Sequence, residues 1–340
     1  MRFRTLLACL TVLAVLVLPT TSNADTQPNT LTKSEIENGW LLLFDGETTW
    51  GWKVPEGVVK WSVVDGVLQA EGEGVSELPG TTVFGDFEMT LEVRTGPAEK
   101  WRSVSLARKG GGTGRATTQS VIVVSGQPLT LVHRVAGVVQ FRNIKLRPLN
   151  LESIFNGKDL TGWNVIPAHQ SVFTVTPEGW LNVKNGNGDI QTDKTWGNFV
   201  LQLDVFSNGD HLNSGVFFRA NKGLFWSGYE AQIRNQWEGD NRNKPVDYGT
   251  GAIYNRQPAR KVVSSDREWF KMTVTANEYH LATWVNGYQV ADFNDPRPVD
   301  ETNARKGARK TPGVISIQGH DPTTDLSFKN IKIADIPTSK

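Results

Sequence analysis

Residues 43–52 read LFDGETTWGW, and residues 154–163 repeat the phrase as IFNGKDLTGW, with six residues from the first glycine to the last tryptophan in each. A second phrase closes each stretch, because FRNIKL at 141–146 returns as FKNIKI at 328–333. The same two phrases therefore open and close two stretches of the chain in the same order. This arrangement predicts two related units, which we call the first and the second copy.

The two copies differ in their middles. Both contain a similar strand, Phe87–Val93 in the first copy and Phe199–Val205 in the second, but the second copy has far more chain between this strand and its closing phrase. Nearly all the polar and aromatic residues that could form a site lie in this extra chain. We therefore expect any chemistry to belong to the second copy.

The strand pattern predicts an all-β protein. From Leu201 to Val205 apolar and polar residues alternate, which places one side of the strand against a core. Asn286-Gly287 is typical of a type I′ hairpin, because both central residues of that turn need a positive φ. Many short strands between Gly, Asn and Pro turns favour two antiparallel β-sandwiches of the jelly-roll or lectin kind, the first of them shortened. Further strands are expected at Ser214–Arg219, Tyr229–Arg234, Phe270–Ala276, His280–Val285, Tyr288–Phe293, Val314–Gln318 and Leu326–Ile333.

The boundary between the copies is expected near Pro148–Glu152, with a first domain at 31–149 and a second at 151–340. Thr32 and Glu35 have the spacing of a capping box, and Gly39 is a suitable stop. One short helix is therefore predicted ahead of the first copy.

Residues 1–24 have the composition of a secretory signal peptide. Arg2 and Arg4 precede an apolar run from Leu6 to Leu18, and the small residues Ser22 and Ala24 favour cleavage after Ala24. The run is shorter than the roughly 20 apolar residues that a membrane span requires, and no later segment approaches that length. We expect an exported protein without a membrane span, in the periplasm or outside the cell.

Cleavage would change the chemistry that the mature chain can offer. It would remove the single cysteine, Cys9, and with it any disulfide or thiolate site. It would also remove two arginines and change the formal charge from +1 to −1. A chain with so little net charge has no electrostatic basis for binding nucleic acid.

Several phrases of the second copy resemble the 3-keto-disaccharide hydrolase family. They are SIFNGKDLTGW at 153–163, NSGVFFR at 213–219, GYEAQI at 228–233, TGAIY at 250–254 and the segment 313–320. The resemblance covers essentially all of 151–335, whereas the first copy matches at its two ends and one central strand and looks like a shortened, non-catalytic relative. It implies a concanavalin-like or laminin-G-like jelly roll, an exported bacterial protein, and action on sugars already oxidised at C3.

The reaction that the resemblance implies is an elimination, possible with few catalytic groups. A ketone at C3 acidifies the hydrogen on C2, so a base can remove it, the enolate can expel the substituent at C1, and water can later add to the product. This chemistry needs a base that works near neutral pH and a partner for the enolate oxygen. We expect His320 as the base with Glu230 as its competitor, Arg219 as stabiliser of the enolate or partner of Glu230, and Tyr254 to assist departure of the leaving group.

Further residues are expected to bind the oligosaccharide or 3-keto-glycoside. Period two places Gln232 beside Glu230 and Gln318 beside His320, if each strand runs that far. Sugars also stack their C–H faces on aromatic rings. The remaining candidates are Asn213, Trp226, Trp237 and Tyr229.

Each of these residues also has a purely structural interpretation. His320 can be a loop residue ahead of Asp321-Pro322, Arg219 can belong to a structural ion pair, and Tyr254 can simply pack by its ring. The aromatic residues can form a core cluster. A non-catalytic carbohydrate-binding protein is therefore the alternative to an enzyme, since lectin-like folds serve both functions.

The spacing of the ligand-type residues predicts no metal site. Asn208, Asp210 and Asn213 form an oxygen-rich loop that could bind Ca²⁺, but they lack the spacing of an EF-hand. An Asx-rich turn is the simpler interpretation. Whether a divalent cation lies beside Glu230 is left open by the sequence.

Overall fold

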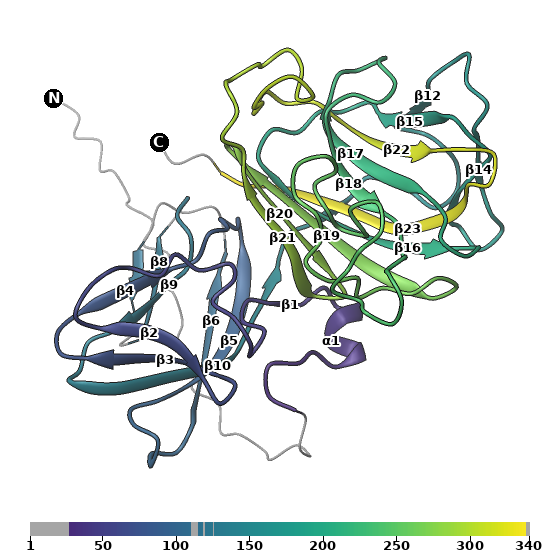
Figure 1. Cartoon of the computed structure of the whole chain (residues 1–340). Coiled ribbons are helices and arrows are strands. Elements are labelled where there is room, and N and C mark those ends of the chain that lie inside the picture. Colours follow the sequence, from purple (N-terminus) through teal and green to yellow (C-terminus); the bar gives the residue numbers. More distant parts are fainter. Residues whose placement is uncertain (1–26, 110–114, 118–119, 125, 338–340) are drawn as a thin grey trace, which may run out of the picture.

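The computed structural model describes residues 27–109, 115–117, 120–124 and 126–337, and these residues are built almost entirely of strands. The strands form four antiparallel sheets, two in each copy (Figure 1). The predicted fold class, an all-β protein of two antiparallel sandwiches, is confirmed. The predicted signal peptide at 1–24 lies outside the described residues.

The described part of the first copy has a six-stranded and a four-stranded sheet. Their orders are β2-β3-β10-β5-β6, with β1 paired to β10, and β4-β9-β8-β7. The strands are β1 (Leu41–Leu42), β2 (Lys60–Val64), β3 (Val67–Gly72), β4 (Ser76–Pro79), β5 (Phe87–Arg94), β6 (Arg102–Arg108), β7 (Arg115–Thr117), β8 (Val121–Val124), β9 (Thr130–His133) and β10 (Gly137–Pro148).

The second copy has an eight-stranded and a five-stranded sheet. Their orders are β13-β14-β23-β16-β19-β20-β21, with β11 paired to β23, and β12-β15-β22-β17-β18. The strands are β11 (Glu152–Ser153), β12 (Trp163–Val165), β13 (Val172–Val175), β14 (Leu181–Lys184), β15 (Gly188–Thr192), β16 (Phe199–Ser207), β17 (Ser214–Ala220), β18 (Tyr229–Ile233), β19 (Trp269–Asn277), β20 (His280–Val285), β21 (Tyr288–Asn294), β22 (Val314–Gly319) and β23 (Asp325–Asp335).

Two local predictions are confirmed in detail. Helix α1 (Lys33–Glu37) begins with the full capping box, in which the Thr32 hydroxyl accepts from the Glu35 N–H and the Glu35 carboxylate accepts from the Thr32 N–H. Asn286 and Gly287 join β20 to β21 with φ values of 49° and 76°, as a type I′ turn requires.

The opening phrase folds in the same way in both copies. The indole of Trp52 donates a hydrogen bond to the carbonyl of Leu43, and the indole of Trp163 donates to the carbonyl of Ile154, both at 2.7 Å. A tryptophan nine residues after the start thus closes each loop. This bond explains why the spacing to the last tryptophan is the same in both phrases.

The closing phrases also share a conformation. Asn143 and Asn330 both lie in the left-handed region, with φ values of 52° and 51°, and the strand register shifts beside each of them. Asparagine tolerates this region better than most residues, so it suits a bulge in a long strand. Each phrase therefore encodes a bent strand, in β10 and in β23.

The core of the second copy lies between its two sheets. Leu201 and Leu203 of β16 pack there with Val216 of β17 and Ile317 of β22, and all four are fully buried. The alternation in β16 predicted this buried side correctly.

The first copy covers the outer face of the eight-stranded sheet. Val200, Ala282 and Trp284 of that sheet belong to the core cluster of the first copy, and Trp284 is only 1% exposed. Gln202 donates a hydrogen bond to the carbonyl of Gly39 at 2.9 Å. The five-stranded sheet lies on the side of the second copy that faces away from the first copy (Figure 1).

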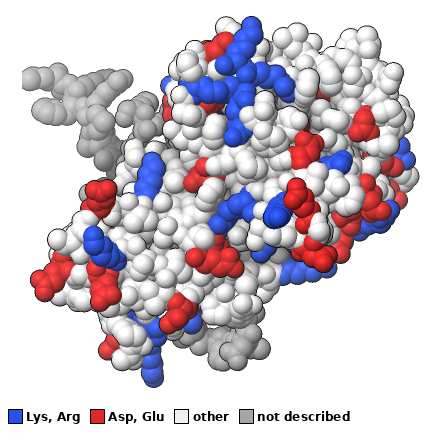
Figure 2. Space-filling model, in the orientation of Figure 1, with Lys and Arg blue, Asp and Glu red and all other residues white. Residues whose placement is uncertain are grey.

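In the described residues, no helix is long and apolar enough to cross a membrane. Basic and acidic side chains both occur over the face shown in Figure 2, with one group of basic side chains at the top of the view. This distribution agrees with the small net charge of the chain.

Candidate active site

The outer face of the five-stranded sheet carries two rows of side chains. Phe217 of β17 lies directly opposite Glu230 of β18 and also opposite Ser316 of β22, which in turn faces Gln191 of β15. Directly opposed residues share one face of a sheet. The register therefore places Gln191, Ser316, Phe217 and Glu230 in one row across four strands.

The second row lies beside the first. Asp189 is opposite Gln318, and Gly215 is opposite Gln232. A Cβ atom at Gly215 would lie 2.4 Å from Oε1 of Glu230. The carboxyl group of Glu230 therefore extends over Gly215 towards the middle of the sheet, and the missing side chain makes room for it.

These polar side chains are buried although they do not face the core. Gln191, Gln232 and Ser316 are each 1% exposed, and Glu230 is 6% exposed. Burial of polar groups normally requires hydrogen bonds, so an atom without one points to a missing ligand or water. Four such buried acceptor atoms occur on this face or at its edge: Asp189 Oδ1, Asn213 Oδ1, Glu230 Oε2 and Gln318 Oε1.

Glu230 is the most strongly perturbed carboxyl group of the face. Burial raises its pKa to about 8, while the positive charge of Arg305 acts in the opposite direction. The guanidinium Nη2 of Arg305 is 4.0 Å from Oε2 of Glu230, which is an ion-pair distance but too long for a hydrogen bond. A carboxyl group that titrates near neutral pH suits a general base or acid.

Arg305 is held in place by Trp226. Its Nε donates to the Trp226 carbonyl at 2.7 Å, and its guanidinium lies 4.0 Å from the centre of the indole ring. The Trp226 side chain is still 46% exposed. A cation and an exposed aromatic ring thus lie together at the rim beside Glu230, as predicted for Trp226.

A second carboxylate, Asp247, organises the polar side chains around Glu230. It accepts hydrogen bonds from Asn213 at 2.9 Å and from Gln232 at 3.1 Å. Burial, followed by the negative charges of Asp247 and Glu230, raises the pKa of Tyr254. The structure therefore brings Asn213, Gln232 and Tyr254 together with Glu230, as the sequence suggested.

Arg219 does not pair with Glu230, contrary to expectation. It is fully buried, and its guanidinium donates to the carbonyls of Gly197 and Arg309 and to the side chain of Asn198. Burial lowers its pKa to about 10. Arg219 therefore connects chain segments within the fold, and Arg305 is the cation that faces Glu230.

Tyr229 does not belong to the substrate-facing side. Because side chains alternate along β18, Tyr229 faces the core, where its ring stacks on Phe218. Its hydroxyl donates to Asp295 and accepts from the N–H of Arg309, both at 2.8 Å. Tyr229 is therefore buried with the core residues, while Glu230 and Gln232 lie on the opposite, outer face of β18.

His320 lies at the rim of the face rather than beside Glu230. It directly follows the end of β22, its side chain is 41% exposed, and its Nδ1 is 2.9 Å from Oδ2 of Asp321. The ring of Trp237 lies under the guanidinium of Arg242 at 4.0 Å. Gln318, by contrast, lies on the polar face, as predicted.

The oxygen-rich loop does not gather into a cation site. Asn208 donates to Asp325, Asp210 pairs with Arg267, and Asn213 donates to Asp247. The described residues contain no group of three or more His, Cys, Asp or Glu side chains that could hold a metal ion.

Sequence reasoning missed five residues of the site. Arg305 and Asp247 lie in irregular segments, where no periodicity indicates the direction of a side chain. The other three are Asp189, Gln191 and Ser316, and the sequence did contain a signal for them. Asp189-x-Gln191 and Ser316-x-Gln318 place polar residues at period two in strands that are otherwise apolar. Such a pattern in a sandwich strand indicates a polar outer face.

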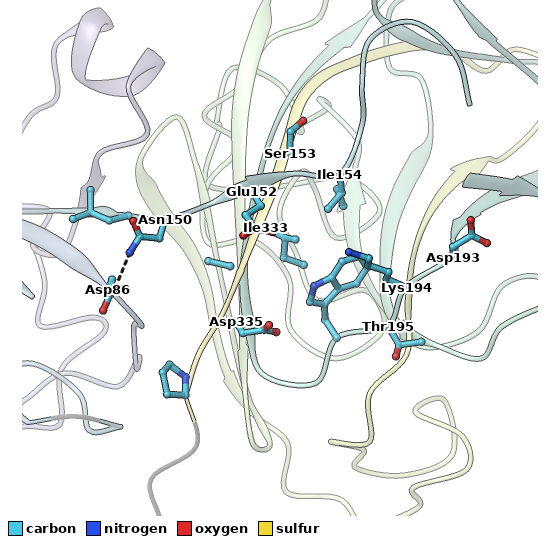
Figure 3. A pocket seen from close by; sticks show the side chains of 14 residues that line it. Asp86, Asn150, Glu152, Ser153, Ile154, Asp193, Lys194, Thr195, Ile333 and Asp335 are labelled. Carbon is cyan, nitrogen blue, oxygen red and sulfur yellow. Dashed lines mark hydrogen bonds between the residues drawn. The ribbon is translucent and has the colours of Figure 1, made fainter. Parts of the chain in front are cut away.

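A cavity of about 640 Å³ lies elsewhere, between the two copies (Figure 3). Its lining is polar and rich in acidic residues, including Asp86, Glu152 and Asp335, and Asn150 donates a hydrogen bond to Asp86 at 2.7 Å. Neither the predicted site residues nor any of the four acceptors without a partner line it. The chemistry therefore favours the five-stranded sheet over the larger cavity.

Comparisons with known proteins found one family model and several solved structures that are similar to this chain. A family model described as a 3-keto-alpha-glucoside-1,2-lyase-like domain matches residues 39–128 and 150–334. A candidate glycosyl hydrolase of known structure from Parabacteroides distasonis is 23% identical, covers 55% of this chain and 94% of its own, and has a TM-score of 0.45. The carbohydrate-binding module CBM66 from Bacillus subtilis is 15% identical, covers 53% and 99%, and has a TM-score of 0.39. The search of curated proteins gave no match.

Proposed function

Since this chain belongs to the 3-keto-alpha-glucoside-1,2-lyase-like family, we propose that it is an enzyme that cleaves 3-keto-glycosides by elimination, with the second copy as the catalyst. The observation that supports this is the group of buried acceptor atoms without a protein partner on the sheet face that carries Glu230. Sugar hydroxyls are donors that would satisfy such acceptors. A carboxyl group with a pKa of about 8 supplies the base that a binding module does not need.

The first step is removal of the C2 proton. The C3 ketone draws the electron pair of the C2–H bond into an enolate, and Glu230 in its ionised form takes the proton. Glu230 becomes neutral as the enolate forms, so the total charge of the pocket does not change. Arg305, 4.0 Å from that carboxyl group, stabilises the negative oxygen.

The second step is loss of the C1 substituent. The enolate electron pair forms the C1–C2 double bond while the C1–O bond breaks, which leaves an enone and an alkoxide. Tyr254, placed near Glu230 and Asp247, donates a proton to the leaving oxygen. Water can then add to the enone, which gives the overall outcome of a hydrolysis.

Glu230 is preferred to His320 as the base because of its surroundings. Glu230 is buried beside a cation, where proton transfer is shielded from water, whereas His320 is exposed and bonded to Asp321 at the rim. In this proposal His320 contacts the outer part of the substrate.

Export through residues 1–24 remains part of the proposal, and fractionation of cells would test it.

The deciding experiment is incubation of the purified protein with 3-keto-trehalose and, separately, with unoxidised trehalose. Enone absorbance and release of glucose from the keto substrate alone are expected, and the same assay with EDTA tests a need for a divalent cation. Saturable binding of sugar without turnover would instead favour the non-catalytic, carbohydrate-binding function.

A further inference from the structure

We propose that Asp189 and Gln318 form a second subsite on the same sheet face, which binds the hydroxyl groups of a sugar leaving group. This inference rests on the proposed function and adds the chemical class of the leaving group. The enzyme would accordingly act on glycosides of sugars in preference to glycosides of small or apolar alcohols.

Asp189 and Gln318 present two acceptor atoms side by side. Asp189 and Gln318 are directly opposite each other on β15 and β22, and each is only 2% exposed. Oδ1 of Asp189 and Oε1 of Gln318 have no hydrogen-bond partner among the residues that the structure describes. Directly opposed side chains lie within reach of one ligand group. Two buried acceptors at this spacing would be stabilised by a ligand that donates hydrogen bonds.

The carboxyl group of Asp189 is also held in a fixed position. Its Oδ2 accepts from the Ser316 hydroxyl at 2.6 Å and from the Gln191 amide at 2.9 Å. These bonds orient the group and leave Oδ1 for a ligand. The same Gln191 amide bonds the carbonyl of Leu224 at 3.0 Å, so the subsite is connected to the loop that carries the exposed Trp226.

A hydroxyl group fits this position better than a cation does. Burial raises the pKa of Asp189, which favours its neutral form. A neutral carboxyl group can donate as well as accept, and a hydroxyl group can do both in return. An ammonium group or a metal ion would require the ionised form that burial disfavours.

The distance from the reacting centre matches a neighbouring sugar residue. The Glu230 carboxyl extends over Gly215 of β17, Gln318 lies on the next strand, and Asp189 on the strand after that. Two strand spacings amount to about 10 Å. Gly215 places no side chain between the two positions. In the proposed pose, a ring with its C2 at Glu230 directs its C1 substituent along the face towards Asp189.

The test compares two substrates with the same reacting ring, 3-keto-trehalose and methyl 3-keto-α-glucoside. The wild type is expected to have the higher kcat/KM for 3-keto-trehalose. Asp189→Asn and Gln318→Met are each expected to lower kcat/KM for 3-keto-trehalose by about 10-fold or more, the scale of a lost buried hydrogen bond, and to leave the methyl glycoside within about twofold. Asp193→Asn, the same change at an exposed position near the end of β15, is the matched control and should alter neither value.

Equal losses for both substrates, or no preference in the wild type, would overturn the subsite. If the wild type turns over neither substrate, the proposed function fails, and calorimetric binding of trehalose decides on the subsite alone. Weaker binding by at least about 10-fold in both variants would then support it, and unchanged binding would overturn it. Thermal unfolding of each variant shows whether it is folded, and the two variants provide independent tests.

Discussion

At the scale of single residues, the carboxyl group of Glu230 determines how activity should depend on pH. With a pKa of about 8, it is mostly protonated at pH 7, so a base at this position becomes more active as pH rises. We expect kcat/KM on a 3-keto-glycoside to increase up to about pH 8 and then level off. Glu230→Gln should lower kcat by at least about 100-fold. A rate that falls above pH 8 would instead assign Glu230 as an acid.

The same group should destabilise the fold at high pH. The folded-state pKa is raised above that of the unfolded chain, so the folded protein holds a proton that the unfolded chain releases between about pH 4.5 and 8. Stability is therefore lost as pH rises through this window. Glu230→Gln should raise Tm relative to the wild type at pH 8.5 and change it much less at pH 4.5. Equal shifts at both values would contradict the burial argument.

The direction of a side chain could be predicted from the sequence where its residue lies in a regular strand. Glu230, Gln232 and Gln318 lie in regular strands, and alternation placed them on one face. The same alternation opposed the choice of Tyr229, which is adjacent to Glu230 and must point the other way. Arg305 lies on an irregular segment far from Glu230 in sequence, and only the folded chain shows that the two are neighbours.

At the scale of elements, Gly215 lets β17 and β18 carry the buried carboxyl group. Alanine at this position would place its Cβ 2.4 Å from Oε1 of Glu230, and the end of that side chain would have to move. Because displacement of about 1 Å can cost roughly 100-fold in rate, Gly215→Ala should lower kcat strongly and Tm only slightly. Gly57→Ala, where no atom lies within 4 Å of the added Cβ, is the matched control. A Gly215→Ala enzyme with normal kcat would contradict this placement of Glu230.

Arg219 lies at the end of β17, where its guanidinium joins the strand to three other segments, at Gly197–Asn198, Glu278 and Arg309. Its bonds to Gly197, Asn198 and Arg309 would all be lost in Arg219→Met. We expect the free energy of unfolding to fall by about 3 kcal/mol or more, because several buried acceptors lose a charged donor. Denaturant titration measures this change. The folded fraction should keep most of its activity, whereas complete loss of activity in well-folded protein would return Arg219 to a catalytic role.

At the scale of the whole molecule, the two copies should unfold together. Trp284 is buried in the core cluster of the first copy although it belongs to the eight-stranded sheet of the second. Trp284→Ala should cost about 3–5 kcal/mol, the usual range for a buried tryptophan. Calorimetry should show one transition in the wild type and a lower Tm or two transitions in the variant. Trp180→Ala is the control of equal size, because Trp180 packs against Trp269 within the second copy. It should lower Tm without splitting the transition.

The contact between the copies could not be predicted from the sequence. The repeated phrases indicated two units, and alternation indicated the inner side of each sheet. No pattern in the sequence tells which outer face another unit will cover. An apolar residue such as Ala282 or Trp284 is equally compatible with packing inside its own copy. The resemblance likewise described one copy at a time.

One small difference between the opening phrases changes what the same turn binds. Oδ1 of Asp45 accepts from the N–H groups of Glu47 and Thr48, and Oδ1 of Asn156 accepts from those of Lys158 and Asp159, so both residues form the same turn. The remaining atom differs. In the second copy it is an amide nitrogen that donates back to Asp159, and in the first copy it is an oxygen that binds Arg260 of the other copy at 2.5 Å. A single nitrogen-to-oxygen exchange at this position thus separates a turn that bonds only within itself from one that joins two domains.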